Sequence, residues 1–194
     1  LALGSGLLLA ALLLGPLGDV RAQQLSYRVD KEYAKIWVNQ DGTIDLWYNI
    51  KTTCISGRMS GFYVGMPNQH FRIGPAKDIS GAELKVADAS SGDNYRVDVT
   101  ILKPLVGGQS SEFTLTVNVA SMIYKDDMNP GNFGLQFLPT WFSDATVLDL
   151  RISIVLPPGA EPDKIKGTPD WSSTPVHDPN EGGRLTVYWE RYNL

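Results

Sequence analysis

Two tryptophans, Trp37 and Trp47, lie on either side of the turn sequence Asn39-Gln40-Asp41-Gly42, among charged and amide neighbours. Aromatic side chains are usually buried, where they remove a large apolar area from water. An outward indole can instead stack on a ligand, and a lysine over its face adds about 0.5–1 kcal/mol at an exposed site. The direction of these two rings therefore decides whether this segment is a candidate binding surface.

The loop between the two tryptophans fixes which way the rings point. A three-residue loop, Gln40-Asp41-Gly42, is a type I turn followed by glycine in the left-handed region, which is a common hairpin form. Asn39 then faces Thr43 and the aliphatic residues collect on one face, whereas a two-residue loop would mix apolar and polar residues on both faces. The other face holds the candidate ligand-binding residues, which are Tyr33, Lys35, Trp37, Asp45 and Trp47.

In this register Lys35 lies directly across from Trp47. Trp37 lies across from Asp45, so the two indoles are diagonal neighbours. Such a patch is either a binding platform or a surface that another part of the chain covers, such as the proline-rich segment that contains Trp171. The sequence leaves both interpretations open.

The sequence contains no recognisable metal or catalytic motif. It has one cysteine and two histidines, His70 and His177, which are too far apart for zinc-ligand spacing. It has no G-x-S-x-G, no H-E-x-x-H and no phosphate-binding G-x-x-x-x-G-K-[ST] motif. A carboxylate pair for glycoside cleavage cannot be located from sequence, because the separation that it requires is spatial. We therefore expect no metal site, no cofactor and no enzymatic activity.

One loop carries hard oxygen ligands of the type that calcium takes. These are Asp126, Asp127, Asn129 and Asn132. The loop lacks the regular D-x-D-x-D-G spacing and the distal glutamate of a calcium-binding hand. Asp and Asn also start turns, and Asn-Pro-Gly is itself a turn sequence. A structural turn is therefore favoured, with calcium binding as the alternative.

Strands must position these residues. Beyond the N-terminal segment, apolar and polar residues alternate in runs rich in Val, Ile, Thr, Tyr and Trp. Nine runs fit this pattern, namely 27–38, 43–53, 61–64, 83–87, 95–102, 112–121, 134–142, 147–156 and 184–192. Turn sequences such as SSGDN and VGGQSS separate them. The pattern predicts an all-β fold, an antiparallel β-sandwich of about nine strands, immunoglobulin-like or jelly-roll-like in type.

A proline-rich segment at 157–183 interrupts the alternation. It is expected to be a long loop with at most a short strand at 165–167. It is either a linker to another domain or a strap across the sandwich. The strap is favoured because Leu185, Val187 and Trp189 in the following strand need a surface to cover. We expect residues 23–194 to form a single β-sandwich domain with this strap.

Residues 1–22 have the features of a signal peptide. The apolar run LALGSGLLLAALLLGPLG is followed by DVRA, which ends in the small residue that an extracytoplasmic signal peptidase requires. With no initiator Met and no basic start, we interpret it as a signal truncated at its start. An uncleaved anchor is the alternative, but the run barely reaches the ~20 residues of a spanning helix. We expect the protein to be secreted or held on the extracellular side of the cell membrane by an anchor beyond Leu194.

The charge balance argues against one class of partner. The 194 residues include 17 Lys and Arg and 21 Asp and Glu, which gives a formal net charge of -4. Nucleic-acid binding draws most of its affinity from Lys and Arg that neutralise phosphates, and this sequence has no basic block. We therefore expect no nucleic-acid partner.

The single cysteine, Cys54, is expected to be a small buried hydrophobic residue, with an intermolecular disulfide as the alternative.

Four segments carry a family resemblance. They are LSYRVDKEYAKIWVNQDGTIDLWYNI, NPGNFGLQFLPTWFS, DLRISIVLPPG and GRLTVYWERYNL. Residues 26–194 resemble the all-β extracellular modules of uncharacterised exported or membrane-anchored proteins of archaeal type. The resemblance implies an extracellular β module, which in such proteins is often followed by a membrane helix. It brings no catalytic residues.

These observations predict a non-catalytic extracellular module that acts in binding or assembly at the cell surface, with a protein or glycan partner. One alternative is a carbohydrate-binding module that uses exposed aromatic residues. Another is a fibre or surface-layer subunit that self-assembles.

Overall fold

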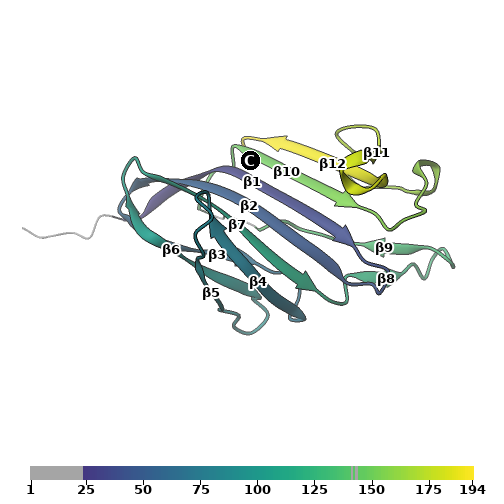
Figure 1. The fold of residues 1–194 in the computed structure, drawn as a ribbon, viewed down its shortest axis with the longest axis horizontal. Helices are drawn as coiled ribbons and strands as arrows, with labels where there is room; N and C mark the ends of the chain where they lie inside the picture. Colours follow the sequence, from purple (N-terminus) through teal and green to yellow (C-terminus); the bar gives the residue numbers. More distant parts are fainter. Residues whose placement is uncertain (1–23, 141, 143) are drawn as a thin grey trace, which may run out of the picture.

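The computed structural model describes residues 24–140, 142 and 144–194. Figure 1 shows one large twisted sheet backed by a smaller one, which confirms the predicted all-β sandwich. The only helical elements in these residues are two single-turn 3-10 helices, Pro162–Lys164 and Pro179–Glu181. No helix in the same residues is long and apolar enough to cross a membrane. The predicted signal segment, 1–22, lies outside the described residues.

The large sheet has seven strands in the order β11-β12-β10-β1-β2-β7-β4. In that order their bounds are Val176–Asp178, Arg184–Tyr192, Asp149–Val155, Ser26–Val38, Ile44–Ser56, Ser110–Val119 and Phe71–Asp78. Every neighbouring pair is antiparallel except β1 and β10, which run parallel. The sheet is therefore mixed rather than purely antiparallel. Alternation along a strand shows which face is buried but not whether the neighbouring strand runs parallel or antiparallel. The parallel pairing of β1 with β10 therefore could not be predicted from the sequence.

The small sheet contains β3 (Arg58–Gly65), β6 (Arg96–Val106) and β5 (Lys85–Asp88), in that order. A separate hairpin of β8 (Ile123–Lys125) and β9 (Phe133–Leu135) lies at the end of the molecule near the β1–β2 turn (Figure 1). Gly42 in that turn lies beside Ile123 of β8. The structure thus has twelve strands in the described residues, compared with about nine in the prediction.

The hydrophobic core lies between the two sheets. The inward side chains of the central strands are fully buried, including Ile36, Leu46 and Ile50 on the large sheet. Across the core, the rings of Phe62 in the small sheet and Phe113 in the large sheet stack with their centroids 5.1 Å apart. Because the opposite faces of the same strands carry polar residues, the outer face of the large sheet is fixed as a polar surface.

Three strands were not predicted from the sequence, namely β4, β8 and β11. Strand β4 contains Gly74 and Pro75, and its register shifts between Ile73 and Ala76. Proline cannot donate to a ladder and so is tolerated at a sheet edge, where β4 lies. Strands β8 and β11 have three residues each, too few to show a period.

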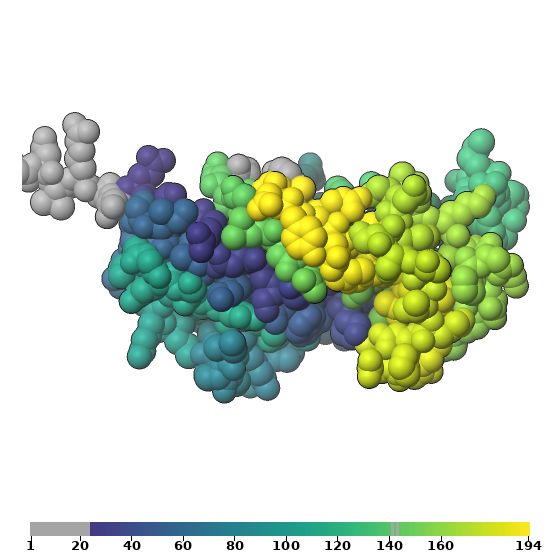
Figure 2. All heavy atoms as spheres, turned by 90° about the horizontal axis from the view of Figure 1, so that it is seen from above, coloured from purple at the N-terminus to yellow at the C-terminus, as the bar shows by residue number. Residues whose placement is uncertain are grey.

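The proline-rich segment 157–183 wraps around the β12 edge of the large sheet, and we call it the strap. On the core side, the ring of Trp171 lies 5.0 Å from that of Trp189, whose Nε1 donates to the Pro169 carbonyl at 2.9 Å. At the edge, the Ser172 backbone N–H donates to the Tyr188 carbonyl, and β11 pairs with β12. Figure 2 shows the yellow-green strap gathered at one end of the molecule beside yellow β12. The sequence prediction allowed at most a short strand at 165–167; those residues have no regular structure, and the strand within the strap is β11.

Candidate binding surface on the outer face of the large sheet

The β1–β2 turn has the predicted three-residue loop. The Asn39 N–H donates to the Thr43 carbonyl at 3.0 Å, and the Gly42 N–H donates to the Asn39 carbonyl at 3.1 Å. Gly42 has a φ of 82°, in the left-handed region that a residue without a Cβ adopts at no steric cost. The Asp41 carboxylate closes the turn by accepting from the Thr43 N–H and hydroxyl.

The register that follows is the predicted one. Lys35 is paired with Trp47, and Trp37 is paired with Asp45. The residues between them on β1 and β2 are buried, so all five candidates, including Tyr33, lie on the outer face. One detail differs: the Lys35 Nζ lies 5.3 Å from the centroid of the Trp37 ring on its own strand, not over Trp47 across the pair.

Trp37 is held by the strap. Its Nε1 donates to Glu181 Oε2 at 2.7 Å, and Lys35 forms an ion pair with the other oxygen of the same carboxylate. Burial acts to raise the pKa of Glu181, but the bonds from Lys35 and Trp37 outweigh it and keep that pKa below its ordinary value. The covering group is thus Glu181 in the second 3-10 turn, whereas Trp171 packs on Trp189.

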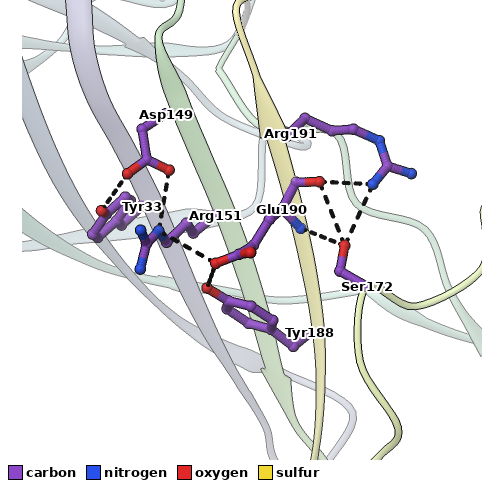
Figure 3. A network of polar contacts seen from close by, with 7 residues as sticks. All are labelled: Tyr33, Asp149, Arg151, Ser172, Tyr188, Glu190 and Arg191. Carbon is purple, nitrogen blue, oxygen red and sulfur yellow. Dashed lines mark hydrogen bonds and ion pairs between the residues drawn. The ribbon is translucent and has the colours of Figure 1, made fainter.

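Tyr33 belongs to a network that joins β1 to β10. Its hydroxyl donates to Asp149 Oδ2 at 2.6 Å, and Arg151 Nε donates to Asp149 Oδ1 at 3.1 Å (Figure 3). The Arg151 guanidinium also lies 4.8 Å from the Tyr33 ring centroid. Burial and the bond to Asp149 raise the pKa of Tyr33 to about 12. Burial opposes ionisation of Asp149, but the bonds from Arg151 and Tyr33 keep its pKa below the ordinary value.

The network continues to β12. Arg151 Nε lies 3.6 Å from Glu190 Oε1, and the Tyr188 hydroxyl donates to the same oxygen. The Glu190 backbone N–H donates to Ser172 Oγ of the strap at 2.7 Å (Figure 3). Burial and the bond to Glu190 raise the pKa of Tyr188 to about 12, so both tyrosines stay protonated at neutral pH.

We call the outer face of β1, β10 and β12 the closed half. Its charged groups are matched to one another: Lys35 with Glu181, Arg151 with Asp149 and Glu190, and Lys31 with Glu112 of nearby β7. The Trp37 indole and the hydroxyls of Tyr33 and Tyr188 are hydrogen bonded as well. A face whose polar groups already satisfy one another offers little to a ligand, because each new bond must first break an old one.

The outer face of β2 and β7 is different, and we call it the open half. Trp47 lies there between Lys35 and Thr116. Among the described residues its Nε1 has no hydrogen-bond acceptor and its ring has no aromatic or cationic partner. Beside it, Asp45 accepts from Asn118 Nδ2 at 2.8 Å and from Asn39 Nδ2 at 3.1 Å. The open half therefore presents a half-buried indole in a row of hydroxyl, amide and carboxylate groups.

Sequence reasoning missed the residues that close the first half, namely Asp149, Arg151, Glu181, Tyr188 and Glu190. Asp149 and Arg151 are two apart on one strand, as are Tyr188 and Glu190, so period two places each pair on one face. That signal was present in the sequence. Their proximity to Tyr33 was not, because it depends on the parallel pairing of β1 with β10.

The remaining candidates are accounted for by local structure. Cys54 is fully buried, as expected, and unpaired. In the loop predicted as a turn or a calcium site, Asp126 Oδ1 accepts from the backbone N–H groups of Met128 and Asn129. Outside residues 1–23, 141 and 143, no three Cys, His, Asp or Glu side chains are grouped to hold a metal ion.

Comparisons with known proteins show likeness in fold alone. No family model and no curated protein matches the chain. An M1 zinc metallopeptidase from Deinococcus radiodurans superposes with a TM-score of 0.56 at 14% identity, over 87% of this chain and 40% of that one. A mutant of an M1 zinc metallopeptidase from the same organism, bound to a Tyr-Ser-Ala substrate, gives 0.55 at 13% identity over 85% and 39%. This chain thus spans about two fifths of the length of these solved structures.

Proposed function

We propose that the chain is a non-catalytic binding module that acts at the extracellular face of the cell, with the open half of the large sheet as its contact surface. The observation that carries this proposal is the contrast between two neighbouring indoles, one bound by the strap and the other without a hydrogen-bond partner in the part of the chain that the structure describes. A rigid aromatic side chain on central strands adds contact area at low entropic cost, which is why tryptophan is enriched at binding hot spots.

The chemistry around Trp47 favours a glycan as the ligand. A sugar ring has an apolar face that can stack on an indole and a rim of hydroxyls that exchange hydrogen bonds. Beside the ring, the Thr116 hydroxyl donates to the Pro75 carbonyl and the Asn118 amide donates to Asp45, so the side-chain oxygens of Thr116 and Asn118 can still accept from sugar hydroxyls. The Asp45 carboxylate is held in place by two amide donors. An anionic ligand has less to gain, because Asp45 lies on the same face as the ring and Lys35, the cation across from Trp47, is already paired with Glu181.

The test is a titration of the protein with a panel of soluble polysaccharides, followed by tryptophan fluorescence and calorimetry. Trp47→Ala should reduce affinity at least tenfold, equivalent to about 1.4 kcal/mol. Tyr63→Ala is the matched control, because Tyr63 is an aromatic residue 55% exposed on the small sheet. Equal loss in both variants, or no binding to any polysaccharide, would overturn the glycan proposal. Light scattering of the same sample tests self-assembly into a fibre or surface layer.

The structural comparisons favour a second candidate function. The chain superposes over most of its length on a minor part of M1 zinc metallopeptidases, one of which is described as having two domains. On this proposal the chain is a non-catalytic β-domain that works beside a peptidase domain. The purified chain should then leave the tripeptide Tyr-Ser-Ala uncut with or without added Zn²⁺. Zinc-dependent cleavage by this chain would show that it is itself an enzyme.

A further inference from the structure

A carboxylic acid lies inside the core of the large sheet. Glu32 is 1% exposed, and like Ala34 and Ile36 it points to the inner face of β1. A register shift between Val29 and Lys31 keeps Val29 on that inner face as well. The Glu32 Oε1 atom is buried without a hydrogen-bond partner among the described residues. Burying an acid with an unsatisfied oxygen raises the free energy of the folded state, so the position of Glu32 calls for an explanation.

The groups that face Glu32 are neutral. On β2 the directly opposite residue is Ile50, and the diagonal one is Tyr48, whose hydroxyl is also buried without a hydrogen-bond partner among the residues that the structure describes. On β10 the opposite residue is Leu150. Thr140 lies close enough to the Tyr48 oxygen to act on its pKa, but not in hydrogen-bonding geometry.

Within residues 24–140, 142 and 144–194, no cation offsets the burial of Glu32. Burial alone raises its pKa from 4.5 to about 8. Asp149 and Arg151 flank Leu150 but face the opposite side of the sheet. Burial, and then the charge of Asp144, raise the pKa of Tyr27. Burial raises the pKa of Tyr48 too, and Glu32 adds to that effect. At neutral pH this part of the core therefore contains an uncharged acid beside an uncharged phenol.

Glu32 lies directly beneath the network of the closed half. The next residue, Tyr33, is on the outer face and bonds to Asp149, while Glu32 itself is paired with Leu150, the neighbour of Asp149. A charge formed at Glu32 would need water or a displaced strand at the parallel β1–β10 junction, because among the described residues no cation faces the carboxylate and its Oε1 accepts no hydrogen bond. Movement of that junction would also separate Tyr33 from Asp149.

We propose that Glu32 is a proton-operated switch, which keeps the β1–β10 junction closed while the acid is neutral and opens it when the acid loses its proton. The signal passes to the outer face through the adjoining pair of Tyr33 and Asp149. This inference is independent of the proposed ligand, because it concerns the junction and not the open half.

The sign of the effect follows from proton linkage. The folded protein keeps the Glu32 proton up to about pH 8, whereas the unfolded chain loses it near pH 4.5. Between these values the folded state binds more protons, so stability falls as pH rises. Ionisation of Glu32 therefore does not lower the free energy of unfolding below pH 4.5. It lowers that free energy progressively as the pH rises, and the effect is complete above pH 8.

The direct test is an NMR titration of the Glu32 side-chain carboxyl carbon in the intact protein. We expect a midpoint at least two pH units above the ordinary glutamate value of 4.5, with exposed Glu83 as the reference signal. A midpoint near 4.5 would overturn the proposal. This measurement needs no variant, so it stands even where substitutions disturb folding.

The second test separates a switch from a buried acid that titrates without consequence. Amide hydrogen exchange is compared at the same pH between the wild type, Glu32→Gln and the control Glu83→Gln. At pH 9 the amides of Val29 and Leu148, whose hydrogen bonds tie β1 to the start of β10, should exchange about tenfold faster in the wild type and the control than in Glu32→Gln. At pH 4, below the ordinary glutamate pKa of 4.5, the three proteins should agree. Equal exchange at pH 9 in all three would refute the switch.

Discussion

Trp37 and Trp47 lie on the same face of neighbouring strands, yet their contacts with the rest of the protein differ. Trp37 donates to Glu181 of the strap and has Lys35 near its ring, while Trp47 has neither kind of partner among the described residues. The difference does not come from the sheet, because both indoles project from long central strands. It comes from the strap, which crosses the edge of the sheet and ends over β1. An outward position is therefore necessary for a binding surface, but it is not sufficient.

The largest effect should come from Glu181→Ala. The change leaves the Lys35 ammonium without its ion-pair partner and the Trp37 N–H without its acceptor. It also removes the contact that holds the strap on the outer face. We expect a loss of about 2 kcal/mol in the free energy of unfolding, measured by denaturant titration. Glu181→Gln keeps an acceptor for Trp37 and should lose less. If the two variants were equally stable, the hydrogen bond from Trp37 to Glu181 would contribute nothing to the free energy of unfolding.

Asp149→Ala should follow, with a loss of about 1–1.5 kcal/mol, because Tyr33 and Arg151 lose their shared acceptor. The readout is the same denaturant titration, with the exposed residue Asp127 as a matched control: Asp127→Ala should stay within about 0.5 kcal/mol of the wild type. A larger loss in the control variant would contradict the assignment of stability to the network.

Acid should weaken the closed half selectively. The pKa values of Asp149 and Glu181 lie below their ordinary values of 3.8 and 4.5. Lowered values mean that the stability they contribute is present above about pH 4.5 and is lost as pH falls through the folded-state values. A thermal melt series from pH 6 to pH 2 should show a smaller decline for Asp149→Asn and Glu181→Gln than for the wild type. Parallel declines would show that these carboxylates are not responsible.

The smallest effect on stability should come from Trp47→Ala, below about 1 kcal/mol, because the indole gives up packing but no hydrogen bond. Trp37→Ala in the same titration should cost more, since it also leaves Glu181 without one of its donors. Equal losses at both positions would remove the distinction between the closed and open halves.

Local pattern was enough to predict the hairpin and its faces. The sequence around Gly42 allowed one loop length that sorts apolar from polar residues, and the structure has that loop and that register. Burial of one face is a strong constraint, because a slip of one residue would expose every inward side chain. The same logic placed the five candidate residues on the outer face.

Long-range pairing lay beyond that logic. Nothing in the alternation of β10 shows that it runs parallel to β1, so the bonds between Tyr33 and Asp149 could not be foreseen. Glu181 lies in a proline-rich stretch with no period, and only its fold around the sheet edge brings it to Trp37. Glu32 was detectable in part, because it precedes Ala34 by two residues on the buried face.

The parallel pair also has a consequence for how the chain acquires its structure. Strand β1 forms a hairpin with β2 through a three-residue turn, but its other edge must wait for β10, which follows more than a hundred residues later in the chain. Contacts so distant in sequence form slowly, since a long loop must close first. Until then β1 exposes unpaired backbone groups beside Ile36, which is the kind of edge that recruits a neighbouring chain. Chains interrupted before Val155 should therefore aggregate rather than stop at a soluble half-sandwich.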